Sequence, residues 1–432
     1  MNNAPITDAE TRTLFAPLAS YPHLALAVSG GPDSVALMHL AVGWTRSHGG
    51  SPKLSVLTVD HGLRPESRDE AKMVQHQAKQ LGLPHAILAW EREDAVSTNV
   101  QARARAARYE LMAAWCHAHD IPALVTAHHL DDQAETFLMR LARGSGLDGL
   151  AAIPERSTWA GIAVLRPLLD LPKTRLVATL DDRGIEYVTD PSNVDPRFER
   201  ARMRNNIEAL AKLGLTPEAL ALSAQRLRRA REALEQYAEG FLAKHSEMSE
   251  AGYATVDAQA LAAAPQEIAL RALARLIGAV GGGEEPVRLV KLEALLAALT
   301  ENPDKTHTLG RCRLEPISGR LGIFREARAH GLPVLRLKPG ERALWDNRFR
   351  IELGRHARAP LTVKALGEAG LKQLRKRSEI SASLPRIAGR TLPACWRNDE
   401  LLGVPALGGA SSPGVDCRAV FINAEHPSGL NR

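Results

Sequence analysis

The chain has 432 residues, of which 45% are hydrophobic and 24% charged. No apolar run approaches the roughly 18 residues needed to span a bilayer, and the first residues do not resemble a secretory signal. We therefore exclude a membrane protein and expect a cytoplasmic protein of two or three domains. The net charge of +6 permits a polyanionic partner without demonstrating one.

Residues 20–190 alternate short strand-like runs with amphipathic stretches of helical length. The strand-like runs are LALAV, LSVLTV, HAILAW and ALVTA. This alternation is typical of a parallel sheet covered by helices on both faces. It predicts a doubly wound α/β domain over residues 1–212.

The pattern changes after this domain. Thr216-Pro217-Glu218 combines an N-cap, a first-turn proline and an acid that suits the helix dipole, so it predicts the start of a long helix. Leucines recur every seven residues here, and we expect four of them in the core: Leu213, Leu220, Leu227 and Leu234.

More helical sequence follows, interrupted at 281–283 by three glycines, and then a hairpin-like stretch begins at His307. We predict a mostly helical middle domain over 213–330. Short strand-like runs divided by Pro and Gly predict a small α+β domain over 331–432.

The four cysteines lie far apart, and none belongs to a CxxC pair: Cys116, Cys312, Cys395 and Cys417. This spacing argues against a zinc site, an iron–sulfur cluster or a redox centre. We expect reduced, structural thiols.

A glycine turn at residues 29–34, SGGPDS, follows the first strand-like run and precedes an apolar helical stretch. At such a turn, free backbone amides and the helix dipole converge on an anion. The lysine of the usual phosphate loop and the GxGxxG spacing of dinucleotide folds are both missing. Asp33 would repel phosphate unless a divalent cation lay between them, which points to Mg²⁺. The alternative is an ordinary turn in which Ser29 or Asp33 caps the helix.

A second polar loop, AHHLDDQAET, follows a later strand and also opens a helix. It places His128 and His129 at the carboxyl end of that strand, where open parallel sheets bind ligands. Asp131, Asp132 and Glu135 can share one helix face, which suits a metal ion or an ammonium group. Zinc is disfavoured because adjacent histidines point apart and HExxH is absent. The alternative is an acidic first turn favoured by the helix dipole.

Two further stretches carry polar groups. TVDHGLRPES ends the second strand with Asp60 and His61, and NVQARARAARYELM opens a helix. Arg105 and Arg108 stand three residues apart on that helix, so they can share a phosphate. The alternative is a solvated helix face.

Together, the motifs SGGPDS, DHGLRPES, QARARAARY, HHLDDQAET, RGSGLDGL, RPLLDLPKTRL and DPSNVD resemble those of the tRNA(Ile)-lysidine synthetases in order and spacing, over residues 20–210. SGGxDS alone marks the wider group of ATP pyrophosphatases, whereas HHLDDQAET with RPLL is more specific. The resemblance implies a PP-loop, Rossmann-like fold with a helical middle domain and a small C-terminal domain.

The resemblance also implies a ligase that uses ATP and Mg²⁺. Such an enzyme adenylates the cytidine at the first anticodon position of tRNA(Ile) with a CAU anticodon. Free L-lysine then displaces AMP and forms lysidine, and pyrophosphate is the other product. The sequence leaves the oligomeric state open, and a homodimer is possible.

Matching motif positions imply residue roles. The ATP-binding residues would be Ser29, Gly30, Gly31, Pro32, Asp33, Ser34, Asp60 and His61. The chemistry would fall to Asp33, Arg105, Arg108, Asp131, Asp132 and Glu135, with Asp33 and Asp131 as magnesium ligands. The tRNA-binding candidates are Arg202, Arg204, Lys372, Arg375, Lys376 and Arg377. The RNxxR-like element near Arg204 has an uncertain register.

Three competing interpretations remain at this point. A tRNA thiolase would share the ATP site but typically carries paired cysteines. A small-molecule ligase that adenylates its substrate would not need the basic C-terminal segments. A tRNA-binding protein without catalysis would not need the acids.

Overall fold

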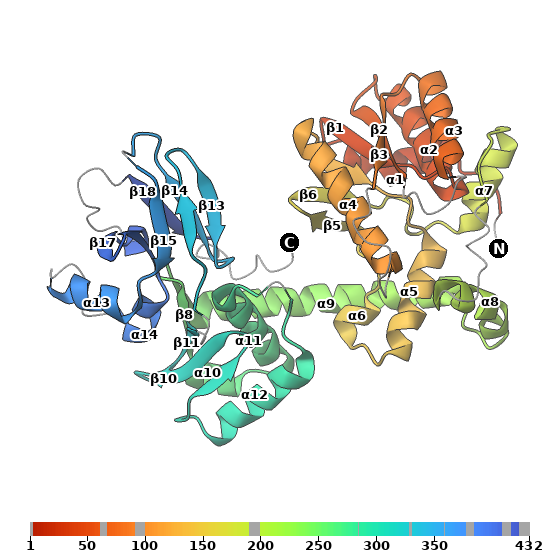
Figure 1. The fold of residues 1–432 in the computed structure, drawn as a ribbon. Helices are drawn as coiled ribbons and strands as arrows, with labels where there is room; N and C mark the ends of the chain where they lie inside the picture. The colour runs from red at the N-terminus through yellow and green to blue at the C-terminus, as the bar shows by residue number, and fades with distance from the viewer. Residues whose placement is uncertain are drawn as a thin grey trace. The chain divides into compact units, whose positions relative to one another are not determined.

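The structure is a computed structural model of the chain. It describes residues 3–60, 67–90, 100–189, 199–283, 285–327, 331–357, 359–376, 384–407 and 416–422. The chain forms two compact units, Met1–Arg231 and Glu232–Leu430 (Figure 1). The domain boundaries after residues 212 and 330 stay predictions. No helix among the described residues is long and apolar enough to cross a membrane.

The first unit is built on a six-stranded sheet with the order β3-β2-β1-β4-β6-β5. The strands are β1 (His23–Ala27), β2 (Lys53–Asp60), β3 (His85–Ala89), β4 (Ala123–Val125), β5 (Arg156–Trp159) and β6 (Ile162–Leu165). All neighbouring pairs are parallel except β5 with β6. The predicted α/β fold is confirmed.

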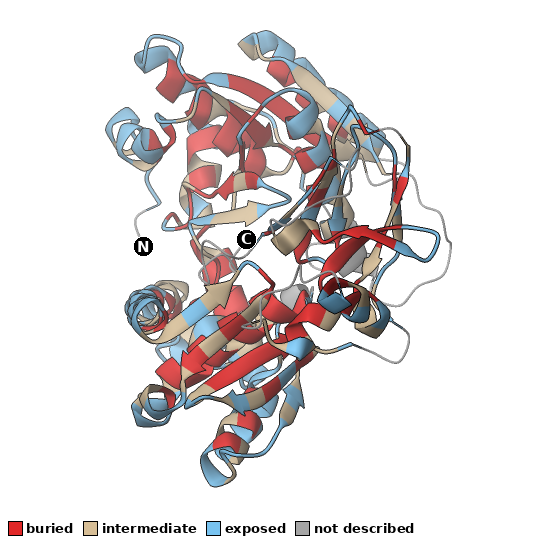
Figure 2. Cartoon of the chain, turned by 90° about the vertical axis from the view of Figure 1, so that its left-hand side faces the viewer, coloured by how far each residue is buried: buried red, intermediate tan, exposed pale blue. Residues whose placement is uncertain are grey.

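Helices accompany this sheet. They are α1 (Asp8–Phe15), α2 (Pro32–Ser47), α3 (Ser67–Leu81), α4 (Val100–Ala118), α5 (Leu130–Ala142), α6 (Leu147–Leu150), α7 (Lys173–Asp182) and α8 (Glu199–Lys212), with a 3₁₀ turn η1 (Ala16–Leu18) after α1. Some of them cover the two faces of the sheet, while others pack against α5 in a separate cluster. One core cluster joins Phe15 and Trp44 to β1, and a second joins Met112 of α4 to Leu57 of β2. The middles of β1 and β2 and all of β4 are buried, as expected for a sheet enclosed on both sides, and Figure 2 shows the whole chain coloured by burial.

A long helix, α9 (Pro217–His245), begins where the sequence predicts it. The side chain of Thr216 accepts a hydrogen bond from the amide of Ala219 at 3.2 Å, which is the predicted N-cap. Leu220 is buried, and Leu227 packs against the same cluster. The expectation for Leu213 is wrong: it lies in the turn before the helix and is 78% exposed.

The second unit begins with a five-stranded antiparallel sheet, order β7-β8-β11-β10-β9. Its strands are β7 (Ser246–Ser249), β8 (Tyr253–Asp257), β9 (His307–Leu309), β10 (Cys312–Ile317) and β11 (Arg320–Arg325), and its helices are α10 (Ala258–Ala263), α11 (Gln266–Gly281) and α12 (Leu289–Glu301). The hairpin after His307 is confirmed, whereas β7 and β8 were not expected. Helix α11 ends at the predicted glycines, where Gly282 adopts φ +60° and caps the helix.

Two smaller antiparallel sheets complete the unit, with the orders β12-β15-β16-β17 and β13-β14-β18. Their strands are β12 (Leu335–Leu337), β13 (Arg342–Trp345), β14 (Phe349–Leu353), β15 (Leu361–Ala365), β16 (Pro393–Arg397), β17 (Glu400–Gly403) and β18 (Cys417–Phe421), accompanied by α13 (Gly367–Lys376), α14 (Arg386–Arg390) and the 3₁₀ turn η3 (Pro405–Leu407). Both sheets share one apolar core around Trp345, Phe349 and Trp396. The α+β expectation is confirmed, and all four cysteines are reduced and buried.

A buried ionic cluster ties β11 to these sheets. Arg325 donates two hydrogen bonds of 2.9 Å to the carboxylate of Asp346, and Arg348 donates one of 2.7 Å. Arg348 also donates to the carbonyl oxygen of Thr391 at 2.8 Å. Burial by itself would raise the pKa of Asp346, but the two guanidinium groups outweigh it and hold that pKa below its ordinary value.

We expect Asp346→Asn to destabilise the protein by about 3–5 kcal/mol, because it leaves two buried guanidinium groups without their counter-charge. Asparagine tolerates the φ of +53° at this position, so backbone strain does not confound the result. Denaturant unfolding measures the change. Asp399→Asn is the matched control, since that side chain is solvent-exposed and its pair with Lys364 is loose at 4.0 Å.

The sign of the pH dependence follows from the lowered pKa of Asp346. Stabilisation by this carboxylate is fully present above its unfolded pKa and is lost as the pH falls through its folded pKa. The stability difference between wild type and Asp346→Asn should therefore shrink on acidification. A difference that is small at neutral pH, or that grows in acid, would contradict this account.

Candidate active site

The two polar loops predicted from the sequence meet at one edge of the six-stranded sheet. Strands β1 and β4 are parallel neighbours, and the order reverses between them, with β2 and β3 on one side and β6 on the other. The carboxyl ends of strands at such a switch point form the ligand crevice of open α/β sheets. The loop after β1 carries SGGPDS, and the loop after β4 carries His128 and His129.

The glycine turn is held open by its serines. Ser34 donates its hydroxyl to the carbonyl oxygen of Gly31 at 3.0 Å and accepts a hydrogen bond from the amide of Ser29 at 3.1 Å. Gly30 has φ +92°, which a residue with a side chain rarely adopts. The amides of Gly30 and Gly31 donate to no other described residue. The N-cap residue of α2 is Gly31, which has no side chain to cap the helix, so the N-terminus of α2 can receive an anion.

A buried histidine lies at the centre of the site. The side chain of His129 is 2% exposed and has three carboxylates around it. Its Nε2 lies 3.5 Å from Asp33 and from Asp132, and its Nδ1 lies 3.3 Å from Asp131. Burial alone would lower the pKa of His129, but the carboxylates outweigh burial and raise it to about 10. The ring is therefore an imidazolium at neutral pH.

Lys173, the first residue of α7, joins the two loops. Its amide donates to Asp131 at 2.9 Å, and its ammonium donates to Asp33 at 3.1 Å. Burial would raise the pKa of each carboxyl group, but His129 and Lys173 together hold both pKa values below the ordinary range. Asp33 and Asp131 are therefore fully ionised.

Glu135 and Arg204 form the neighbouring pair. Glu135 is fully buried in α5 and accepts hydrogen bonds from Nε and Nη2 of Arg204, which comes from α8. Burial would lower the pKa of Arg204, but Glu135 and the nearby aspartates raise it. The structure thus brings Arg204 to the acids, whereas the Arg202 side chain is exposed.

The remaining residues predicted for ATP binding and catalysis lie elsewhere on the same unit or outside the described residues. Asp60 ends β2 and accepts a hydrogen bond from Ser67 at 2.6 Å, whereas His61 falls outside the described residues. The guanidinium groups of Arg105 and Arg108 lie 5.4 and 6.0 Å from the ring centroid of Tyr109. Contact of either arginine with phosphate stays a prediction.

Sequence reasoning missed Lys173. The signal was the PK pair in RPLLDLPKTRL, since Pro172 begins a helix and leaves the next residue at an N-terminus. Nothing in the sequence ties that lysine to Asp33, which is 140 residues earlier. The two histidines do point apart, as expected, because Nδ1 of His128 contacts Thr126 at 2.8 Å.

The acids of the site offer one possible place for a metal ion. Within the described part of the chain, no group of three or more His, Cys, Asp or Glu residues forms a ready-made metal cage. Asp33 nevertheless has one oxygen, Oδ1, that is buried and lacks a hydrogen-bond partner there. Mg²⁺ commonly binds through one or two carboxylates plus substrate phosphates, and a single free carboxylate oxygen beside an anion-binding turn fits that mode.

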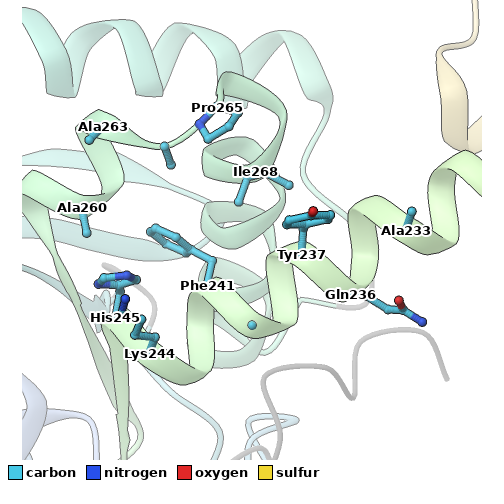
Figure 3. A pocket seen from close by; sticks show the side chains of 12 residues that line it. Ala233, Gln236, Tyr237, Phe241, Lys244, His245, Ala260, Ala263, Pro265 and Ile268 are labelled. Atoms are coloured by element: carbon cyan, nitrogen blue, oxygen red, sulfur yellow. The ribbon is translucent and has the colours of Figure 1, made fainter.

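A separate cavity of about 900 Å³ lies in the second unit, between α9 and the helices α10 and α11 (Figure 3). Its walls are mostly apolar and include Tyr237, Phe241 and Ile268, with Lys244 and His245 at one end. None of the predicted site residues lines it. Size alone is therefore a poor guide to the chemistry of this protein.

Comparison with known proteins identifies the family of the chain. Residues 4–210 match the PP-loop domain family. A protein of Bradyrhizobium sp. named tRNA(Ile)-lysidine synthase is 48% identical over 306 residues, which cover 69% of this chain and 85% of the relative. A protein of the same name from Ruegeria pomeroyi is 38% identical over 390 residues, which cover 89% and 88%.

Among solved structures, a U34-tRNA thiolase from Methanococcus maripaludis aligns with 51% of this chain and 77% of its own, with 16% identity and a TM-score of 0.44. The two tRNA(Ile)-lysidine synthases match this chain at much higher identity and over most of their own length. The chain belongs to the tRNA(Ile)-lysidine synthase family, ATP-dependent ligases with a PP-loop domain.

Proposed function

We propose that this protein acts in the cytoplasm and ligates free L-lysine to the cytidine at the first anticodon position of tRNA(Ile) with a CAU anticodon, converting ATP into AMP and pyrophosphate. The observation that carries the proposal is the cluster of Asp33, His129, Asp131 and Lys173 beside an uncapped helix N-terminus. It combines a place for phosphate with ionised acids that can receive a cation.

In the first step, the ring carbonyl oxygen of the cytosine attacks the α-phosphorus of ATP and the bond to the β-phosphate breaks. The free amides of Gly30 and Gly31 and the N-terminus of α2 hold the departing pyrophosphate. Asp33 and Asp131 would hold Mg²⁺, which supplies charge neutralisation on the phosphates when bound. Arg105 or Arg108 stabilises charge that develops on the phosphate or the base.

In the second step, the ε-amino group of lysine attacks the activated ring carbon, AMP leaves, and the amine gives up a proton. Asp131 and Asp132 are the candidates for orienting the incoming lysine. The contact of the Lys173 ammonium with Asp33 illustrates that this cluster accepts an alkylammonium group. Glu135 already pairs with Arg204, so its part is to orient that guanidinium beside the acids.

The thiols argue against a thiolase. Cys116, the cysteine of the first unit, is fully buried among α4 and the sheet, and burial raises the pKa of its thiol to about 11. A protonated, buried thiol is a poor nucleophile. The ligase is therefore the better reading of this ATP site.

The function is tested by incubating the protein with ATP, labelled lysine and total tRNA. We expect label in one tRNA species, together with one AMP per lysine incorporated. Formation of AMP without any labelled tRNA would indicate a small-molecule ligase and would contradict the proposal.

Asp33→Asn serves as the matched inactive variant in that assay. It keeps the side-chain shape but removes the ionised carboxylate that faces His129 and Lys173, so we expect adenylation to fall to background while circular dichroism stays native. Normal turnover by a folded Asp33→Asn protein would remove Asp33 from the mechanism.

We also propose that α13 contacts the tRNA backbone. Lys372, Arg375 and Lys376 are exposed on the face of α13 opposite its buried leucines, whereas Arg377 lies outside the described residues. Two neighbouring cations are less available, because Arg386 and Arg390 both pair with Glu368. The homodimer stays a prediction.

Replacing Arg375, Lys376 and Arg377 with Gln should weaken the binding of every tRNA, whatever its sequence. The slope of the logarithm of the binding constant against the logarithm of salt concentration should become less steep by about 2, because phosphate contacts act through counterion release. ATP binding should not change. Filter binding at several salt concentrations measures both quantities.

The control triple Arg288→Gln, Lys291→Gln and Lys305→Gln removes the same charge from exposed positions near α12. Equal weakening by both triples would assign the effect to net charge alone. If the variant with Arg375, Lys376 and Arg377 replaced kept the wild-type tRNA affinity and salt dependence, tRNA would have to bind elsewhere on the protein.

A further inference from the structure

The glycine turn lacks a lysine of its own, yet the fold supplies one. A phosphate loop normally carries a lysine next to its glycines, and SGGPDS has none. In the structure, the ammonium of Lys173 lies 3.1 Å from Asp33, the second residue of α2. A cation therefore reaches this anion-binding turn from a separate helix.

Several contacts fix the start of α7 firmly. The Lys173 amide donates to Asp131, and the carbonyl oxygen of Leu171 accepts from the amide of Leu130 at 2.9 Å. Further along α7, Arg175 forms a bidentate pair with Glu10 at 2.9 and 3.0 Å. The backbone of Lys173 is thus held by its neighbours on both sides, and only its side chain is free to change partner.

The two cations of the cluster differ in accessibility. The His129 ring is 2% exposed and has a carboxylate on each nitrogen, so it cannot leave without burying uncompensated charge. The Lys173 side chain is 34% exposed, and its ammonium pairs with Asp33. With His129 retained, Asp33 keeps a counter-charge when the lysine departs.

We propose that Lys173 is a phosphate-binding residue: Asp33 holds its ammonium when no nucleotide is bound, and the ammonium moves to the β- and γ-phosphates of ATP when nucleotide enters. Lys173 then supplies the charge that the lysine of a phosphate loop would supply. The inference rests on the proposed use of ATP and adds a residue to it.

Calorimetric titration with ATP and with AMP tests this role. Lys173→Met should weaken ATP binding about 10- to 100-fold, the range for losing one charge-assisted hydrogen bond, and should leave AMP binding unchanged because AMP lacks the outer phosphates. Lys173→Arg should recover part of the ATP affinity. Lys72→Met is the matched control. Lys72 is exposed and pairs with Asp69 at 2.8 Å, so we expect this variant to bind ATP as tightly as the wild type does.

Circular dichroism confirms folding of each variant, and Lys173→Gln replaces Lys173→Met if the latter does not fold. Unchanged ATP affinity in the folded variant would overturn the inference, as would equal weakening of ATP and AMP, which would mean that Lys173 only shapes the turn. The labelled-lysine assay separates the two claims. If the wild type forms lysidine but replacing Lys173 leaves ATP affinity unchanged, this inference alone is refuted. If the wild type forms no lysidine but replacing Lys173 weakens ATP binding, the ligase is refuted and Lys173 remains a phosphate-binding residue.

Discussion

The arrangement of the site depends on one buried cation, the imidazolium of His129. Three carboxylates lie within 3.5 Å of its ring, and they come from α2 and α5. Like charges this close would drive one another to take up protons if no cation lay between them. The imidazolium lowers the pKa values of Asp33 and Asp131, and it holds the turn after β1 against the turn after β4. Asp131 then extends the arrangement to α7 through the amide of Lys173.

This constraint explains how one edge of a sheet can serve two opposite charges. The N-terminus of α2 and the free amides of Gly30 and Gly31 suit an anion, whereas the carboxylates suit a cation. The two proposed steps need both, because pyrophosphate leaves the α-phosphorus in the first step and the amine of lysine attacks the ring carbon of the base in the second. The switch point between β1 and β4 brings the two loops together, and ion pairing fixes their separation.

The sequence predicted the features that depend on neighbouring residues, namely the types of the secondary-structure elements and the start of a helix. The alternation of strand-like and helical runs predicted the α/β sheet, and Thr216 with Pro217 predicted the start of α9. Contacts between distant segments were beyond such reasoning. Neither the pair of Lys173 with Asp33 nor the choice of Arg204 over Arg202 for Glu135 has a signature in the spacing of residues. The spacing of one leucine every seven residues wrongly predicted that Leu213 lies in the core, because this spacing begins one turn before the helix does.

The protonation state of His129 is the most direct test of this account. Nitrogen NMR of the ring in the protein without nucleotide or metal reports whether both nitrogens carry a proton. The account predicts an imidazolium that persists at about pH 8, well above the ordinary histidine pKa. A neutral ring at that pH, titrating in the ordinary range, would contradict the claim that a buried cation holds the two loops of the site together.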